Sequence, residues 1–289
     1  MPASARVVVT APVVRARKGS GEPLVMVTAY DTPSARIADE AGVDAILVGD
    51  SLAMVVLGHE DTLGVSIQEM AHHTAAAARA RPNALLVADL PWMSYHLDAA
   101  DTVRNASILV RAGAGAVKLE GGRKRLPMVS ALLDAEIPVM GHVGLTPQSV
   151  HVTGGYKVQG RGAEAGAEVM ADALALAEAG CFSIVLEAIP ASLAGQVTEA
   201  VAVPTIGIGA GPLCDGQVLV FHDLLGLEDR PKATFVRRYA SLKTDAVAAL
   251  ARFAADVRSG AFPSEDESYG SGQGVLGVVD GHRGGSKTA

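Results

Sequence analysis

Short apolar runs that end in an ionisable residue recur along this sequence. Four of them occupy residues 46–51, 85–89, 117–120 and 184–187. The polar residues at their ends are Asp50 with Ser51, Asp89, Glu120 and Glu187. Apolar runs of this length predict strands buried on both faces, as in parallel sheets. Because the carboxyl ends of parallel strands lie together, the four endings predict one shared site.

Helical patterns alternate with apolar runs along most of the chain. Strands are predicted at residues 24–30, 45–50, 85–89, 116–120, 138–143, 183–187, 204–208 and 217–221. Helices are predicted at about residues 31–40, 66–81, 98–112, 123–135, 163–179, 191–201 and 233–258. Eight such strands can form an open doubly wound sheet or a closed (β/α)8 barrel. Strands two to six all end in ionisable groups, which a barrel gathers round one mouth, so we expect a single (β/α)8 TIM barrel.

The two ends of the chain lack the patterns of the middle. Residues 1–21 show no sustained period, and we expect them to form an N-terminal arm that is poorly ordered or a short edge element. Residues 264–289 are rich in Gly, Ser and charge, which is typical of a flexible tail. The expected catalytic barrel therefore covers residues 22–263.

Composition and charge exclude several classes of protein. Hydrophobic residues make up 49% of the chain, enough for a large core, yet no run approaches the ~20 apolar residues of a membrane span. The N-terminus makes a poor signal peptide, so we expect a cytoplasmic protein. The net charge is −7 and basic runs are short, which predicts a small-molecule ligand and no nucleic-acid or membrane partner. The two cysteines, Cys181 and Cys214, are expected to stay reduced.

Side-chain alternation along the strands predicts where the acids point. Residues two apart on a strand share a face, so Asp50 should face the same way as Ile46 and Val48. By the same rule Asp89 should face the same way as Val87, and Glu187 the same way as Val185. Lys118 should share a face with Glu120, while Leu119 faces a helix. We expect all four acids to continue inward-facing rows into the barrel mouth.

Four carboxylates beside one lysine, Lys118, would repel one another unless protons or a cation were present. All-oxygen ligands suit Mg²⁺, which would act as a Lewis acid on a bound carbonyl. Other interpretations stay open for each residue. Asp50 and Asp89 could cap the next helix, Lys118 and Glu120 could form a rim ion pair, and Glu187 could adjoin a helix N-cap. His142 could be a packing residue or a site residue.

Two glycine-rich segments follow the later strands. The loop of residues 146–162, from Thr146 to Gly162, is longer than most strand-to-helix connections and is a candidate lid or binding loop. The segment 207–211 could hold a phosphate, although tight packing or close approach of the backbone to a ligand is the favoured use of its glycines.

Six motifs in fixed order resemble the 3-methyl-2-oxobutanoate (ketopantoate) hydroxymethyltransferase family, from about residue 24 to residue 268. They are VGDSL at 48–52, ADLP at 88–91, VKLEGG at 117–122, GHVGLTPQS at 141–149, GGYKVQG at 154–160 and IGIGAG at 206–211. The resemblance implies a barrel of the phosphoenolpyruvate mutase/isocitrate lyase kind that assembles as a homodecamer. It also implies transfer of a hydroxymethyl group from 5,10-methylenetetrahydrofolate to 3-methyl-2-oxobutanoate, giving 2-dehydropantoate in pantothenate synthesis.

The resemblance also implies roles for the residues of the predicted site. Asp50 and Asp89 would bind one Mg²⁺ per subunit, with Glu120 completing the site directly or through water. The keto acid would be held by Asp50, Ser51, Asp89 and Lys118, with His142 as a secondary candidate. The base would be Glu187. Ala53 stands where many relatives have Gly.

Two other functions compete with this one. Another Mg²⁺-dependent enolate-forming lyase or mutase of the same barrel group is the nearest, although the Lys-Lys-Cys-Gly-His segment expected of the lyases is absent. A metabolite-binding barrel without a base is disfavoured by the presence of Glu187.

Overall fold

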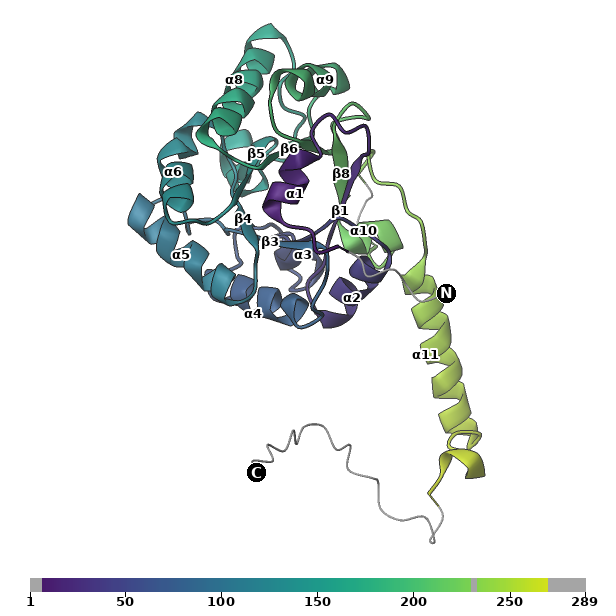
Figure 1. Cartoon of the computed structure of the whole chain (residues 1–289). Coiled ribbons are helices and arrows are strands. Elements are labelled where there is room, and N and C mark those ends of the chain that lie inside the picture. The colour runs from purple at the N-terminus through teal and green to yellow at the C-terminus, as the bar shows by residue number, and fades with distance from the viewer. Residues whose placement is uncertain (1–6, 230–232, 270–289) are drawn as a thin grey trace, which may run out of the picture. The chain divides into compact units, whose positions relative to one another are not determined.

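The computed structural model describes residues 7–229 and 233–269. Its centre is a closed barrel of eight parallel strands in sequence order, with β8 paired to β1 (Figure 1). The strands are β1 (Leu24–Thr28), β2 (Ala45–Val48), β3 (Leu85–Asp89), β4 (Ala116–Lys118), β5 (Val139–Gly144), β6 (Ser183–Glu187), β7 (Thr205–Ile208) and β8 (Gly216–Leu219). The predicted (β/α)8 barrel is confirmed, and each predicted strand has a counterpart.

Helices surround the barrel on its outer side (Figure 1). The longer ones are α2 (Thr32–Glu40), α4 (Ile67–Ala78), α5 (Ala99–Arg111), α6 (Leu126–Asp134), α8 (Ala163–Ala179) and α9 (Ala191–Ala200). Capping boxes start α2 at Asp31 and α4 at Ser66, where each side chain accepts a backbone N–H of the first turn. The short helices α3 (Leu52–Val55), α7 (Val150–Thr153) and α10 (Phe221–Leu225) lie in connections that the sequence patterns did not identify as helical.

Buried side chains form two layers that reveal which way each strand residue points. One cluster joins strand residues such as Ile46, Val48 and Leu119 to the surrounding helices. The other joins strand residues such as Leu47 and Val87 to one another inside the barrel. Alternate residues of a strand therefore fill different layers, as the period of two requires.

A short helix lies across the amino-terminal end of the barrel. Helix α1 (Ala11–Ala16) places Ala11 and Val14 in the inner cluster, where Val14 is 2% exposed. Beyond the helix, the Lys18 Nζ lies 2.8 Å from Asp215 Oδ2 beside the start of β8. We expected a poorly ordered arm or a short edge element here, and α1 corrects that expectation for residues 11–16. The apolar residues of α1 form too short a run to show a period in the sequence. They are nevertheless enough to cover this end of the barrel. Residues 1–6 of the expected arm lie outside the described residues.

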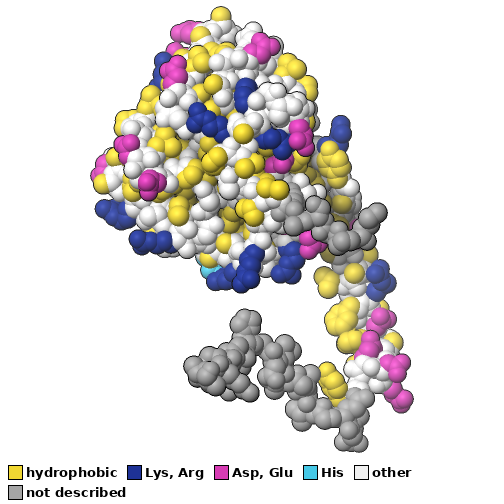
Figure 2. All heavy atoms as spheres, viewed as in Figure 1, with side chains coloured by type: hydrophobic (Ala, Val, Ile, Leu, Met, Phe, Trp, Pro, Cys, Tyr) yellow, Lys and Arg dark blue, Asp and Glu magenta, His cyan; other side chains and the backbone are white. Residues whose placement is uncertain are grey.

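The contacts divide the chain between Ala240 and Ser241, whereas we expected the barrel to extend to residue 263. The second unit contains α11 (Leu242–Ser259) and the 3-10 turn η3 (Glu265–Glu267). Helix α11 exposes apolar side chains along its length, among them Val247, Leu250, Phe253 and Val257 (Figure 2). Residues 270–289 of the expected tail lie outside the described residues. Within residues 7–229 and 233–269, the longest apolar helices fall short of what crossing a bilayer requires.

Candidate active site

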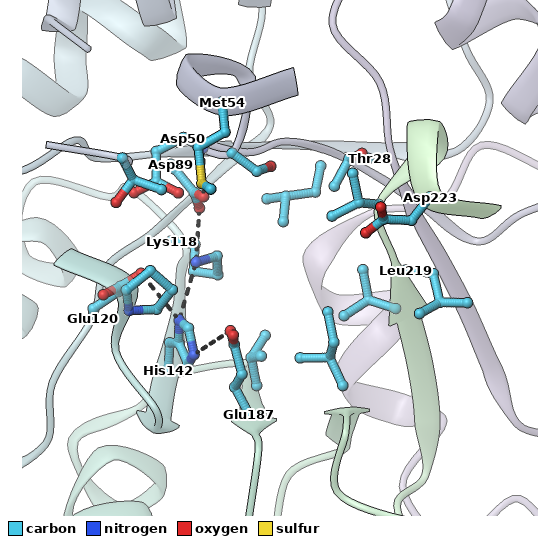
Figure 3. A pocket seen from close by; sticks show the side chains of 18 of the residues that line it. Thr28, Asp50, Met54, Asp89, Lys118, Glu120, His142, Glu187, Leu219 and Asp223 are labelled. Atoms are coloured by element: carbon cyan, nitrogen blue, oxygen red, sulfur yellow. Dashed lines mark hydrogen bonds and ion pairs between the residues drawn. The ribbon is translucent and has the colours of Figure 1, made fainter. Parts of the chain in front are cut away.

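A cavity of about 230 Å³ opens at the carboxyl ends of the strands. It brings together every residue that the sequence predicted for the site, namely Asp50, Ser51, Asp89, Lys118, Glu120, His142 and Glu187. Figure 3 shows Asp50, Asp89, Lys118, Glu120 and His142 on one side, with Glu187 beside His142, and Thr28, Leu219 and Asp223 on the other side. We call the side with Asp50, Asp89, Lys118 and Glu120 the charged wall. The apolar side chains of Leu47, Val185, Ile208 and Phe235 also line the cavity.

Asp89 is the last residue of β3 and points inward, as predicted from Val87. Its Oδ1 lies 3.0 Å from Lys118 Nζ, and its Oδ2 accepts the backbone N–H of Asp50 at 3.0 Å. The side chains of both Asp89 and Lys118 are almost fully buried. Asp89 therefore links strands β2, β3 and β4 at the mouth.

Asp50 reaches the cavity by a different route from the one predicted. Ile46 and Val48 pack outward against helices and Leu47 points inward, so the shared face we expected for Ile46, Val48 and Asp50 is wrong. Strand β2 ends at Val48, and the chain turns at Gly49 before Asp50. The turn cancels the alternation and brings the Asp50 carboxylate into the mouth.

The turn after β2 also places Ser51. A side chain on Gly49 would put its Cβ 2.8 Å from Ser51 Oγ, so glycine leaves the space that the hydroxyl occupies. Ser51 Oγ lies 2.9 Å from the Tyr30 hydroxyl and lines the cavity next to Asp50. No sequence pattern indicated the contact with Tyr30, because that residue lies two positions beyond the end of β1.

Lys118 and Glu120 both enter the mouth from β4 and the residues after it, while Leu119 packs in the outer layer, as predicted. Burial alone would lower the pKa of Lys118, but the carboxylates of Asp89, Glu120 and Asp50 outweigh it and raise the pKa. Lys118 is therefore a permanent cation within the acidic wall.

His142 stands between Lys118 and Glu187. Its Nδ1 lies 3.2 Å from Lys118 Nζ, and its Nε2 lies 3.2 Å from Glu187 Oε2. Burial and the Lys118 charge lower the pKa of His142, so the ring is neutral. An ammonium group can only donate, which makes Nδ1 the acceptor and leaves the ring proton on Nε2, facing Glu187. The His142 Nε2 and Glu187 Oε2 atoms lie close together, but the N–H direction does not meet the geometry of a hydrogen bond.

The acids of the charged wall raise one another's pKa values. Burial and the charge of Asp89 raise the pKa of Asp50 to about 7. Burial and the charge of Asp50 raise the pKa of Glu120 well above its ordinary value. Each carboxyl would ionise more easily if a cation lay beside it, so this donor set fits a divalent ion.

The residues for such an ion are arranged as an open site. In the described part of the chain no three side chains of His, Cys, Asp or Glu already converge on a point as a metal-binding group. Asp50 and Asp89 are held together by the hydrogen bond between them, and Glu120 lines the same wall. Mg²⁺ commonly takes one or two carboxylates and fills its other positions with water and substrate, which this arrangement allows.

The loop predicted as a lid contributes to the mouth. It contains the 3-10 turn η2 (Pro147–Ser149) and α7, and its Tyr156 lines the cavity. The Tyr156 hydroxyl lies 3.9 Å from the sulfur of Met54, which also lines the cavity. Gln148 is buried at the start of this loop and hydrogen-bonds Asp50, a contact that the sequence did not indicate although the residue lies in one of the six motifs.

The glycines at 207–211 serve close packing. Gly209 has φ +64°, and a Cβ there would lie 2.7 Å from the ring of Phe235. Gly211 has φ +78°, and a Cβ there would lie 2.4 Å from that of Ala191. These contacts match the tight-packing interpretation of the segment.

Comparisons with known proteins point to one family. A family model described as ketopantoate hydroxymethyltransferase matches residues 8–265. The 3-methyl-2-oxobutanoate hydroxymethyltransferase of Methylobacterium sp. (strain 4-46) is 56% identical over 271 residues, which are 94% of each chain. The enzyme of the same name from Moorella thermoacetica is 56% identical over 262 residues, covering 90% of this chain and 97% of its own.

Solved structures of lower identity share the fold. A 2,3-dimethylmalate lyase, described as a member of the PEP mutase/isocitrate lyase superfamily, superposes with a TM-score of 0.56 at 20% identity over 91% of this chain and 93% of its own. A phosphonopyruvate hydrolase solved with oxalate and Mg²⁺ has a TM-score of 0.58 at 16% identity over 90% and 93%. The predicted barrel type is therefore confirmed.

Proposed function

The chain belongs to the ketopantoate hydroxymethyltransferase family, and on this premise we propose that it transfers a hydroxymethyl group to 3-methyl-2-oxobutanoate through an enolate formed by Glu187. The observation that supports this most is the pairing, in one cavity, of Glu187 with a wall formed by Asp50, Asp89 and Lys118. Enolisation of a 2-oxo acid requires a base for the C3 proton and cationic or metal-binding groups for the carbonyl oxygen within reach of one bound substrate.

The charged wall would receive the carboxylate and 2-oxo group of the keto acid. Lys118 supplies a fixed positive charge, and the Ser51 hydroxyl offers a hydrogen bond. The Val185 side chain, which lies on the same inward face of β6 as Glu187, would contact the branched methyl groups. This placement directs the C3 hydrogen of the substrate toward Glu187.

Asp50 and Asp89 would hold one Mg²⁺, with Glu120 binding it directly or through water. When bound there, the ion supplies positive charge for the developing enolate oxygen. The Asp50 backbone N–H donates to the Asp89 carboxylate at 3.0 Å and so holds that carboxylate next to residue 50. Lys118 offsets part of the negative charge that remains.

Glu187 would remove the C3 proton. The neutral His142 ring places its Nε2 proton toward Glu187 Oε2, with 3.2 Å between the nitrogen and the oxygen, which leaves the other carboxylate oxygen to face the substrate. The contact does not meet the geometry of a hydrogen bond in the free protein. Catalytic hydrogen bonds often align only when substrate binds, and we propose that this one does. His142 is thus a positioning residue for the base.

The carbanion at C3 would then form a bond to the methylene carbon of 5,10-methylenetetrahydrofolate, and the bonds of that carbon to N5 and N10 would break. One water supplies the hydroxyl on that carbon. The second proton of the water and the proton taken up by Glu187 pass to the two nitrogens, so tetrahydrofolate is released with 2-dehydropantoate. The loop of residues 146–162, through Tyr156, is our candidate for closing over the folate. We further propose that the enzyme is cytoplasmic and assembles as a homodecamer.

The direct test is product formation by the purified chain from 3-methyl-2-oxobutanoate and methylenetetrahydrofolate, followed by mass spectrometry. We expect 2-dehydropantoate, loss of product after chelation with EDTA, and recovery on adding Mg²⁺. Cleavage of the keto acid, or no reaction with metal and folate both present, would instead favour the lyase or mutase alternative or a binding role.

A further inference from the structure

Gln148 is a buried amide that contacts two acids of the charged wall. Its Nε2 donates to Asp50 Oδ2 at 2.8 Å and to the Leu90 carbonyl at 3.0 Å. Its backbone N–H donates to Glu120 Oε2 at 3.0 Å. The residue is 6% exposed, so few waters could replace these donors. One residue therefore fixes one oxygen of each of two neighbouring carboxylates.

The orientation of the Gln148 amide is set by Tyr95. The Tyr95 hydroxyl lies 2.6 Å from Gln148 Oε1, and the backbone N–H of Glu120 donates to the same hydroxyl at 3.2 Å. A backbone N–H can only donate, so the single phenolic proton is left for Gln148 Oε1. The amide oxygen must then face Tyr95, and its NH₂ group must face Asp50.

Tyr95 is itself held firmly. It is 1% exposed, and the Arg125 guanidinium lies 5.3 Å from the centre of its ring. Arg125 and Tyr95 come from separate connections on the carboxyl side of the barrel, after β4 and β3 respectively. The chain of contacts thus runs from a packed aromatic ring, through the Gln148 amide, to Asp50.

We propose that Gln148 and Tyr95 are positioning residues for the metal and keto acid site. Gln148 holds Asp50 and Glu120 in place, and Tyr95 acts through Gln148 by fixing which end of the amide meets Asp50. Because Gln148 lies in η2, at the start of the loop of residues 146–162, the same contacts tie the position of that loop to the acids. The inference rests on the proposed function, because that function supplies the metal and the keto acid that the site would bind.

Two variants separate this role from simple packing. Tyr95→Phe keeps the ring but frees the amide to turn, so that its oxygen can face the Asp50 carboxylate. Gln148→Met keeps most of the volume and removes every side-chain donor. Of the side-chain hydrogen bonds that Gln148→Met loses, one goes to the carboxylate of Asp50, and Tyr95→Phe loses the hydroxyl that orients the donor of that bond. We therefore expect each variant to weaken Mn²⁺ binding about tenfold.

The experiment measures the Kd of Mn²⁺, used as a paramagnetic substitute for Mg²⁺, by electron spin resonance with 3-methyl-2-oxobutanoate present. If Tyr95 acts mainly through Gln148, Tyr95→Phe raises the Kd less in the Gln148→Met background than it does alone. Any remaining effect reports the Glu120 N–H that donates to the Tyr95 hydroxyl. Thr74→Val is the control, because Thr74 is fully buried and its hydroxyl donates at 2.7 Å to Met70 within α4. It should lower the melting temperature without changing the Kd.

Three results decide the matter. Wild-type affinity in Tyr95→Phe, or effects of the two substitutions that add in full, would overturn the positioning role. A wild-type chain that binds Mn²⁺ and keto acid but makes no 2-dehydropantoate would count against the proposed reaction and leave the positioning role intact. A wild-type chain that binds no Mn²⁺ would overturn both.

Discussion

At the scale of single residues, Asp50 and Ser51 are neighbours with different surroundings. Asp50 is buried, accepts a hydrogen bond from Gln148 and donates its backbone N–H to Asp89. Ser51 is only partly buried and contacts Tyr30. Asp50 thus belongs to the charged wall, and Ser51 belongs to the rim where substrate would enter.

Replacing each residue by alanine should therefore have different effects. Asp50→Ala removes a proposed metal ligand, and we expect Mg²⁺ affinity and product formation to fall beyond detection. Ser51→Ala removes a proposed hydrogen bond to the substrate carboxylate. We expect this loss to raise KM roughly ten- to hundredfold and to leave metal affinity unchanged. Titration calorimetry and steady-state kinetics give both quantities. Equal losses of metal affinity in the two variants would contradict this division.

The sequence could predict most acids of the site because strand alternation continues to the last residue of a strand. Asp89 and Glu187 end β3 and β6, and Lys118 ends β4, so their directions followed from the inner rows. Asp50 lies beyond the end of β2, and its direction depends on a turn that alternation does not describe. Gln148 and Tyr95 lie in connecting segments, where a side chain's direction is set by contacts that only the folded chain shows.

At the scale of elements, the pairing of β5 with β6 positions the proposed base. Gly144 lies opposite Glu187, and the Leu145 N–H donates to the Glu187 carbonyl at 2.8 Å. Gly144 has φ +94°, and a Cβ there would lie 2.3 Å from the Glu187 carbonyl oxygen. A side chain at residue 144 must therefore displace the backbone that carries the base.

Gly144→Ala should lower kcat about a hundredfold, because an error of ~1 Å in a reacting group costs that much. Gly42→Ala is the matched control, since Gly42 has φ +90° and a Cβ added there would meet nothing within 4 Å. It should cost about 1 kcal/mol in the free energy of unfolding and keep full activity. Kinetics on folded protein, checked by circular dichroism, compare the two. Full activity in Gly144→Ala would show that this pairing does not position the base.

Helix α1 offers a second test at this scale. Val14 is 2% exposed in the inner cluster, whereas its neighbour Val13 is 39% exposed. Val14→Ala should lower the free energy of unfolding by about 2 kcal/mol, and Val13→Ala should change it by less than about 0.5 kcal/mol. Urea denaturation measures both. Similar small changes in the two variants would mean that α1 adds little to the barrel.

At the scale of the whole molecule, the barrel is predictable because eight apolar runs alternate with helical patterns. The division of the chain into two units could not be predicted. The helical period at residues 233–258 says nothing about what that helix packs against. In the structure the helix begins at Leu242 and belongs to the second unit. Its row of exposed apolar side chains suits burial in the assembly that we propose.

Leu250→Asp places a charge in that row, where Leu250 is 67% exposed in the single chain. We expect it to lower the assembly mass measured by size-exclusion chromatography with light scattering. Ala248→Asp, which lies about half a helical turn from Leu250, adds the same charge outside the row and should keep the wild-type mass. An unchanged mass in Leu250→Asp would show that the row is not part of the interface.

The proposed mechanism depends above all on removal of the C3 proton of the keto acid by Glu187. Deuterium uptake at C3 of 3-methyl-2-oxobutanoate in D₂O with Mg²⁺, followed by NMR with and without tetrahydrofolate, measures this step itself. We expect exchange with the wild-type chain, and we expect Glu187→Gln to bind Mg²⁺ and the keto acid normally yet lose exchange. Persistent exchange in Glu187→Gln, or none in the wild type, would contradict the mechanism.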